Sequence, residues 1–96
     1  MKLLPIDSIV VPPTRLRPVL PADVAALSDS IEKLGLLQPL VVEGLTLRAG
    51  EHRLAALRLL FSQGDEVKFG TATLAGLVPT IDVGDLSPLA RLEVEL

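Results

Sequence analysis

The residues best suited to chemistry in this chain are four consecutive ones, Gly50-Glu51-His52-Arg53. They stand between a short apolar segment and a longer apolar run, so Gly50 is expected to turn the chain from a strand into a helix spanning about 51–61. Free backbone N–H groups and the positive end of the helix dipole lie at such a helix start. With Arg53 in the first turn, the four residues are typical of a phosphate site.

A plainer interpretation of the same residues stays open. A first-turn arginine is often only solvated, and a glycine at this point can serve purely as a strand-to-helix turn. Two further arginines lie close by in the sequence: Arg48 precedes the turn, and Arg58 falls seven residues after Glu51 on the same stripe of the helix. Arg58 is expected to pair with an acidic side chain.

The elements that position this motif follow from their apolar patterns. Residues 39–42 and 45–47, separated at Glu43-Gly44, predict a small hairpin of strands. The helix at 51–61 is apolar nearly all round, which predicts that it is buried. Upstream, Pro21 and Gly35 delimit a first helix. Its buried stripe is expected to consist of Val24, Leu27, Ile31 and Leu34.

The remaining segments are short. Residues 3–11 are expected to form one or two strand segments interrupted at Pro5, and the proline-rich residues 12–18 a stiff surface loop. The other expected elements are a loop at 62–66, a strand or hairpin at 67–74 and a last strand at 77–83. Ser87 and Pro88 are typical of a helix start. Because that helix reaches residue 96 without a cap, 87–96 is expected to be the start of a truncated helix in a longer protein.

Composition limits the classes of protein to consider. The chain has 96 residues, of which 49% are hydrophobic and two are aromatic, which predicts one domain with an aliphatic core. It contains no cysteine and one histidine, which excludes disulfides, thiol catalysis and a zinc cluster. No stretch is long and apolar enough to span a membrane, so the expected location is the cytoplasm.

Charge is distributed unevenly along the chain. The net charge is −3, which argues against this fragment binding DNA by itself. Residues 1–60 hold seven basic and six acidic side chains, whereas 61–96 hold two basic and six acidic ones. The basic residues therefore gather around the glycine turn and the early loop.

Two segments resemble the ParB family of partition proteins. The run Gly50-Glu51-His52-Arg53-Leu54-Ala55-Ala56 is similar to that family's "GERRxRA" box, and residues 30–42 resemble its "SI…G-LLQPLVV" segment. The opening Ile6-Asp7-Ser8-Ile9, followed by a loop with proline and arginine, is similar to the start of the family. The resemblance covers about 6–83.

This resemblance implies a ParB/sulfiredoxin-like α+β fold, with a small mixed β-sheet flanked by helices and a single domain over 1–96. It also implies a nucleoside triphosphate, CTP or ATP with or without Mg²⁺, held at the box. The implied nucleotide-binding residues are Gly50, Glu51, His52, Arg53 and Arg17. Gln38 is a further candidate, because it is polar between apolar neighbours and is expected either to face solvent or to make a specific bond.

The chain departs from the family pattern at several positions. His52 and Ala55 replace two arginines of the box, and the family's later "ENxxR" segment is absent, although residues 91–96 resemble the stretch that leads to it. Glu51 stands where sulfiredoxins carry the cysteine of "GCHR", so repair of sulfinic acids is excluded.

Three functions follow as hypotheses. The first is a nucleotide-binding module of a partition or DNA-regulatory protein, which would reach DNA only through a part outside this chain and could form a homodimer. The second is an enzyme, a small-molecule kinase or nucleotide hydrolase with Glu51 as general base. A helix N-terminus stabilises that carboxylate as the anion, which makes it a weak base. The third is a protein-interaction module that has lost nucleotide binding.

Overall fold

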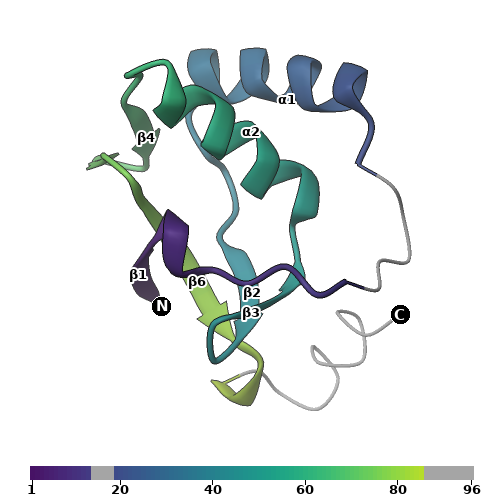
Figure 1. Cartoon of the computed structure of the whole chain (residues 1–96). Helices are drawn as coiled ribbons and strands as arrows, with labels where there is room; N and C mark the ends of the chain where they lie inside the picture. Colours follow the sequence, from purple (N-terminus) through teal and green to yellow (C-terminus); the bar gives the residue numbers. More distant parts are fainter. Residues whose placement is uncertain (14–18, 86–96) are drawn as a thin grey trace.

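The computed structural model describes residues 1–13 and 19–85 (Figure 1). The loop arginines at 15 and 17 and the helix expected from Ser87 lie outside the described residues. In chain order the elements are β1 (Lys2–Pro5), the 3-10 helix η1 (Ile6–Ser8), α1 (Pro21–Leu34), β2 (Leu40–Glu43), β3 (Thr46–Ala49), α2 (Glu51–Ser62), β4 (Val67–Phe69), β5 (Ala72–Leu74), β6 (Leu77–Asp82) and the 3-10 helix η2 (Val83–Asp85).

Four strands form one mixed sheet in the order β1-β6-β2-β3, in which β2 and β6 run parallel and the other pairs are antiparallel. Strands β4 and β5 form a separate antiparallel hairpin. Helix α1 lies across α2, and α2 lies between α1 and the sheet (Figure 1). The predicted α+β class with a mixed sheet and flanking helices is confirmed.

Prolines in the β1–β6 pair occupy positions that donate no hydrogen bond to the partner strand of this pair. The Ile6 N–H donates to the Gly76 carbonyl at 2.9 Å, which makes these two residues a hydrogen-bonded pair. In an antiparallel ladder such pairs alternate with non-hydrogen-bonded ones. Pro5 and Pro79 therefore both fall in non-hydrogen-bonded pairs of this register.

The opening segment differs from the predicted strand over 3–11. Only Lys2–Pro5 is a strand, and the chain then turns through η1, where the Ser8 hydroxyl donates to the Pro5 carbonyl at 2.7 Å. Val10 rejoins the sheet at its far edge, because its N–H donates to Leu45 and its carbonyl accepts from Leu47, both at 2.8 Å. The other predicted strands and the hairpin at 67–74 are confirmed to within about two residues.

Helix α1 begins at Pro21 and is followed by Gly35, as predicted, but its buried stripe is not the expected one. Leu34 is 67% exposed, so its predicted burial is wrong. Buried contacts continue instead from Ile31 to Gly35, a step of four residues that turns Leu34 outward. Ser28 is buried on this stripe, and its hydroxyl donates to the Val24 carbonyl at 2.7 Å.

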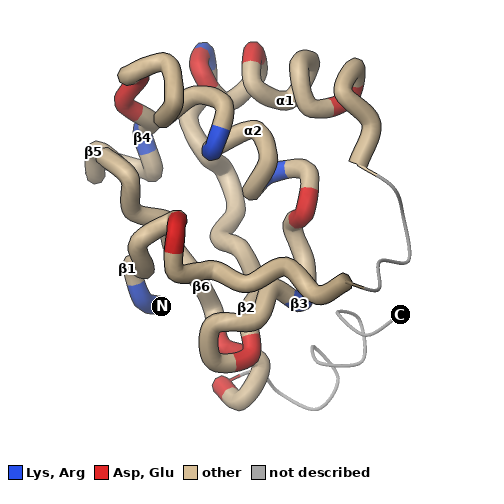
Figure 2. The backbone as a smooth tube through the Cα atoms, viewed as in Figure 1, with Lys and Arg blue, Asp and Glu red and all other residues tan. Residues whose placement is uncertain are grey.

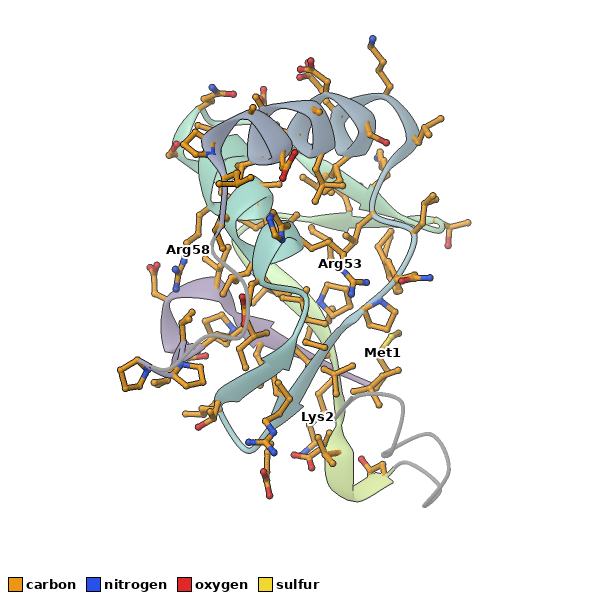
Figure 3. The ribbon with its side chains drawn as sticks, turned by 90° about the vertical axis from the view of Figure 1, so that its right-hand side faces the viewer. Met1, Lys2, Arg53 and Arg58 are labelled. Carbon is orange, nitrogen blue, oxygen red and sulfur yellow. The ribbon has the colours of Figure 1, made fainter. Side chains whose placement is uncertain are left out.

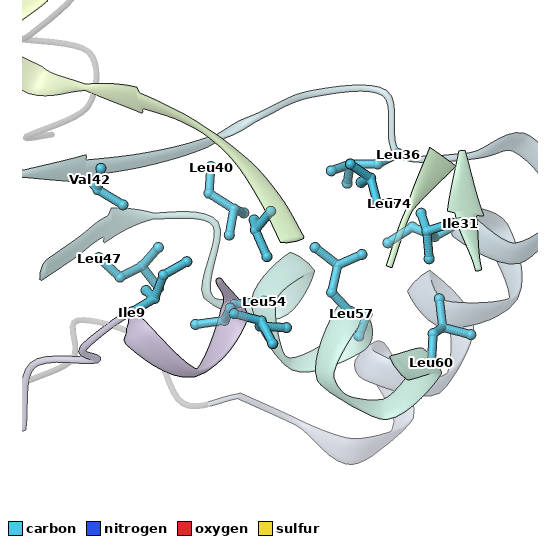
Figure 4. Packing of buried hydrophobic residues seen from close by; sticks show 14 residues of the cluster. Ile9, Ile31, Leu36, Leu40, Val42, Leu47, Leu54, Leu57, Leu60 and Leu74 are labelled. Atoms are coloured by element: carbon cyan, nitrogen blue, oxygen red, sulfur yellow. The ribbon is translucent and has the colours of Figure 1, made fainter. Parts of the chain in front are cut away.

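Helix α2 supplies the centre of the core (Figure 4). Leu54, Leu57 and Leu60 are each at most 2% exposed. The prediction of burial on every side is wrong, because Leu59 is 39% exposed and Arg58 also faces solvent. No described carboxylate lies within 4 Å of Arg58, so the described residues do not provide its expected ion pair. None of the described helices is long and apolar enough to cross a membrane.

Candidate functional site

Gly50 makes the turn between β3 and α2 in a conformation that favours glycine. Its φ of +101° lies in the left-handed region, and a Cβ at this position would stand 2.5 Å from Cδ2 of Leu40. The Gly50 carbonyl accepts the first bond of the helix, from the N–H of Leu54 at 2.8 Å. The N–H groups of Glu51, His52 and Arg53 therefore have no acceptor within α2, and Gly50 provides no side-chain cap.

Arg53 is the best-defined polar group near this turn. Its Nη1 donates to Oε1 of Gln38 at 3.0 Å and to the Pro39 carbonyl at 3.3 Å. Burial lowers the pKa of the Arg53 guanidinium, which still remains a cation at neutral pH. A guanidinium has five N–H donors, and two of them make these bonds. The other three have no acceptor in the part of the chain that the structure describes.

A hollow of about 220 Å³ opens beside Arg53. Its walls come from α1, from the segment between α1 and β2, and from α2. The lining is mainly apolar and consists of Leu27, Ser30, Ile31, Gly35, Leu36, Leu37, Gln38 and Arg53. Sequence reasoning assigned Leu27 and Ile31 to the core only and did not single out Ser30. Their spacing of three and four residues places all three on one face of α1. The hollow itself becomes apparent only from the packing of α1 on α2.

The other residues proposed for the site take different positions. Nε2 of His52 lies 4.0 Å from Oδ2 of Asp23 in the first turn of α1, at the limit of an ion pair. Glu51 is half-buried and makes no side-chain hydrogen bond or ion pair with the described residues. Arg17 lies outside the described residues. The structure thus brings Gln38 and Arg53 together next to Gly50, with His52 directed towards α1.

The arginines outside the hollow are accounted for separately. Arg48 pairs with Glu43 across the β2–β3 hairpin, with 3.7 Å between Nε and Oε1, and both side chains are well exposed. Arg58 lies on the opposite side of α2 from Arg53 (Figure 3). Charges of both signs are mixed over the described residues (Figure 2).

A second hollow, of about 250 Å³, lies where β1, β2 and β6 meet near Asp82 and Lys2. Both carboxylate oxygens of Asp82 accept backbone bonds, Oδ1 from the Gly84 N–H at 2.9 Å and Oδ2 from the Gly44 N–H at 3.0 Å. These two bonds, with a smaller contribution from the charge of Lys2, lower the pKa of Asp82. Asp82 thereby joins the end of β6 to the turn between β2 and β3.

No metal centre is visible in the described ranges 1–13 and 19–85. Nowhere in them do three His, Cys, Asp or Glu side chains come close enough together to hold an ion. A Mg²⁺ held by these residues alone therefore does not fit this site.

With this geometry established, comparisons with known proteins can be assessed. The family model of the ParB N-terminal domain matches residues 1–69. The chain belongs to this family. No curated protein sequence matches it.

Among solved structures, the ParB-family chain is similar to the C-terminally truncated chromosome-partitioning protein ParB from Caulobacter crescentus, complexed with CTP-γ-S. The TM-score is 0.66 and the sequence identity 26%, over 98% of this chain and 49% of that one. The chain therefore spans about half the length of that protein. The fold that the sequence resemblance implied, that of a ParB N-terminal domain, is confirmed.

Proposed function

We propose that this domain binds a nucleoside triphosphate, with CTP as its first ligand, at the start of α2. The observation that carries the proposal is the position of Arg53. Its remaining donors stand beside the free N–H groups of α2, in a fold that in Caulobacter crescentus ParB was solved with CTP-γ-S. Backbone N–H groups, the helix dipole and a fixed guanidinium together suit an anion of high charge.

The residues present fit both parts of such a ligand. Gly50, Glu51, His52 and Arg53 would hold the phosphates, since a glycine turn lets the ligand approach the backbone closely. The apolar hollow with Gln38 at its edge would accept the nucleoside part. Any Mg²⁺ would have to arrive bound to the phosphates. Arg17 remains a proposed contact outside the described residues.

Affinity is expected to be low. A charge-assisted bond from arginine to phosphate contributes about 1.5–3 kcal/mol, and micromolar binding requires about 8 kcal/mol in total. Relative to the family box, the chain has His52 and Ala55 in place of two arginines. Asp23 also stands 4.0 Å from His52 and would repel an anion there. Dissociation constants from high micromolar to millimolar follow.

The proposed biological role is DNA partition or a related DNA-regulatory task. Because the net charge of −3 disfavours contact with DNA phosphates, this proposal assigns DNA binding to another part of a longer protein. The domain is then a nucleotide-dependent module, and we propose that it works as a homodimer.

Isothermal titration calorimetry with CTP, ATP, GTP and UTP, each with and without Mg²⁺, tests the proposal. Arg53→Ala should weaken CTP binding by about tenfold or more. Arg58→Ala is the matched control, because it removes the same charge from the same helix on the side away from the hollow (Figure 3). Equal affinity of the wild type and Arg53→Ala, or equal losses in both variants, would contradict the proposed site.

A further inference from the structure

The wall of the hollow beside Arg53 is supported from behind by the β4–β5 hairpin. This wall is the segment from Gly35 to Gln38, which links α1 to β2. The N–H of Leu36 donates to the carbonyl of Lys68 in β4 at 2.7 Å. It is a short bond, and it joins the middle of the wall to an element that does not itself line the hollow.

Gly35 shows how closely the hairpin approaches the wall. Its φ is +80°, and a Cβ at this position would stand 2.6 Å from the carbonyl oxygen of Lys68 and 3.3 Å from the carbonyl carbon and Cβ of the same residue. Contacts this short leave no room for a side chain between the two segments. The direction of the added atom is towards β4, so the hairpin itself occupies the space behind the wall.

The register of the β4–β5 hairpin directs the Lys68 carbonyl towards the wall. Lys68 faces Thr73 in the register of β4 with β5, one position away from the Phe69–Ala72 pair that closes the turn. The pair next to a two-residue turn is hydrogen-bonded, so Lys68 falls in a non-hydrogen-bonded pair and its carbonyl points away from β5. The Lys68 ammonium also donates to the Thr73 hydroxyl at 2.6 Å, which ties the strands together.

Buried side chains anchor the hairpin at the same end of the core as the wall. Val67 and Leu74 are each 1% exposed, and Leu36 is 3% exposed. Leu36, Leu74 and Ile31 belong to one apolar cluster (Figure 4). A hairpin fixed in this way can hold its neighbour at a constant distance.

We propose that the β4–β5 hairpin is a positioning element of the nucleotide site. The Lys68 carbonyl fixes Leu36, the wall fixes Gln38, and Gln38 orients the guanidinium of Arg53 through its 3.0 Å bond. Lys68 thus acts on the ligand only through other residues. The effect on affinity rests on the proposed function, whereas the effect on Arg53 does not.

Two glycine substitutions at positive φ differ in whether the added Cβ meets the hairpin. Gly35→Ala places a methyl group against the Lys68 carbonyl. Gly64→Ala is the matched control, because Gly64 follows the other helix with a φ of +79° but has no atom within 4 Å of its added Cβ. Both variants introduce a Cβ at a positive φ, and only the first places it against the hairpin. Gly35 also has a ψ of 175°, in a region essentially restricted to glycine, so Gly35→Ala strains the backbone of the wall as well as its contact with Lys68.

The first readout needs no ligand. In ¹⁵N NMR spectra of the free protein, Gly35→Ala should shift the side-chain N–H signals of Arg53 and Gln38, whereas Gly64→Ala should leave both in place. In calorimetry, Gly35→Ala should weaken CTP binding by about tenfold, a typical size for coupling between sites, and Gly64→Ala by less than about twofold. Unshifted Arg53 and Gln38 signals in folded Gly35→Ala would overturn the proposal.

Wild-type protein provides a second test in case Gly35→Ala does not fold. The Leu36 amide should exchange with deuterium as slowly as core amides, and mild urea should speed its exchange in step with the hairpin amides. Exchange at the rate of a free loop amide would also overturn the positioning role. If the wild type binds no CTP, the proposed function fails, and the ligand-free signals and amide exchange decide the positioning role alone.

Discussion

The two hollows described above differ in how much hydrogen-bonding capacity Asp82 and Arg53, the charged residues discussed at each, keep free. Asp82 accepts one backbone N–H on each carboxylate oxygen, so it is committed to holding the end of β6 against a neighbouring turn. Arg53 uses one of its three nitrogens for protein bonds. Among the described residues, its remaining donors have no acceptor.

This comparison teaches that a charge beside a hollow is not enough to identify a ligand site. The carboxylate of Asp82 lies beside the larger hollow, yet its hydrogen bonds explain it as part of the fold. The guanidinium of Arg53 is held in place by two neutral acceptors, and its remaining N–H donors stay available to an anion. Residual bonding capacity, together with a fixed position, distinguishes the binding group from the structural one.

The largest expected effect comes from removing a central side chain of the core on which the whole fold depends. Leu57 is fully buried, so Leu57→Ala should cost about 2–5 kcal/mol of the free energy of unfolding, out of about 5–10 kcal/mol for a domain of this size. Urea titration measures this cost. Leu59→Ala on the partly exposed side of the same helix should cost less than about 1 kcal/mol. Similar costs for the two variants would show that α2 is not packed as described.

The next effect separates the two charged groups by function. Arg53→Ala should lower CTP affinity by about tenfold or more while changing the urea midpoint little. Asp82→Asn should leave the affinity within about twofold, because Asp82 lines the second hollow and not the one beside Arg53. Calorimetry and urea titration on both variants check the contrast. A large loss of CTP affinity in Asp82→Asn would contradict the assignment of Asp82 to the fold alone.

A smaller gain is expected from restoring a charge of the family box. His52→Arg should strengthen CTP binding by several-fold, up to about tenfold, since one more guanidinium becomes available to phosphate. Asp23 competes for the same position at 4.0 Å. Asp23→Asn in the His52→Arg background should therefore raise the affinity further. An unchanged affinity in the double variant would show that position 52 does not face the ligand.

The smallest effect is a pH dependence at the other hollow. The Gly84 and Gly44 N–H groups lower the pKa of folded Asp82, so its stabilising contribution is complete above the ordinary aspartate pKa of about 4 and is lost as pH falls through the lower folded value. The melting temperature of the wild type should exceed that of Asp82→Asn at pH 6, and the difference should shrink towards pH 3. A constant difference would assign the effect to packing.

The sequence predicted most of the fold because its signals were local. Pro21, Gly35 and Gly50 mark helix ends through their own backbone preferences, and the hairpins follow from breaks in apolar runs. Leu34 was misplaced because burial depends on the tilt of α1 against α2, which no periodicity contains. The opening strand was overestimated because Pro5 and Ser8 form a local turn.

The candidate site was only half visible in the sequence. Gly50 and Arg53 lie close together in the chain, and Gln38 stood out as a polar residue between apolar neighbours, without any indication of its partner. The bond between Arg53 and Gln38 spans fifteen residues and depends on how the wall is held. The Lys68 carbonyl carries no side-chain signal, so its contact with Leu36 could be found only in three dimensions.

The pairing of β1 with β6 has a consequence for the order of folding. Lys2 lies opposite Thr80, so this part of the sheet closes across 78 positions of the chain, whereas α1, β2, β3 and α2 meet over much shorter separations. Long-range closure costs more chain entropy and slows folding. During synthesis, β1 is made before the other elements of this domain, but it cannot pair until β6 has been made. The segment from α1 to α2, which contains Gln38 and Arg53, can assemble before the two ends meet.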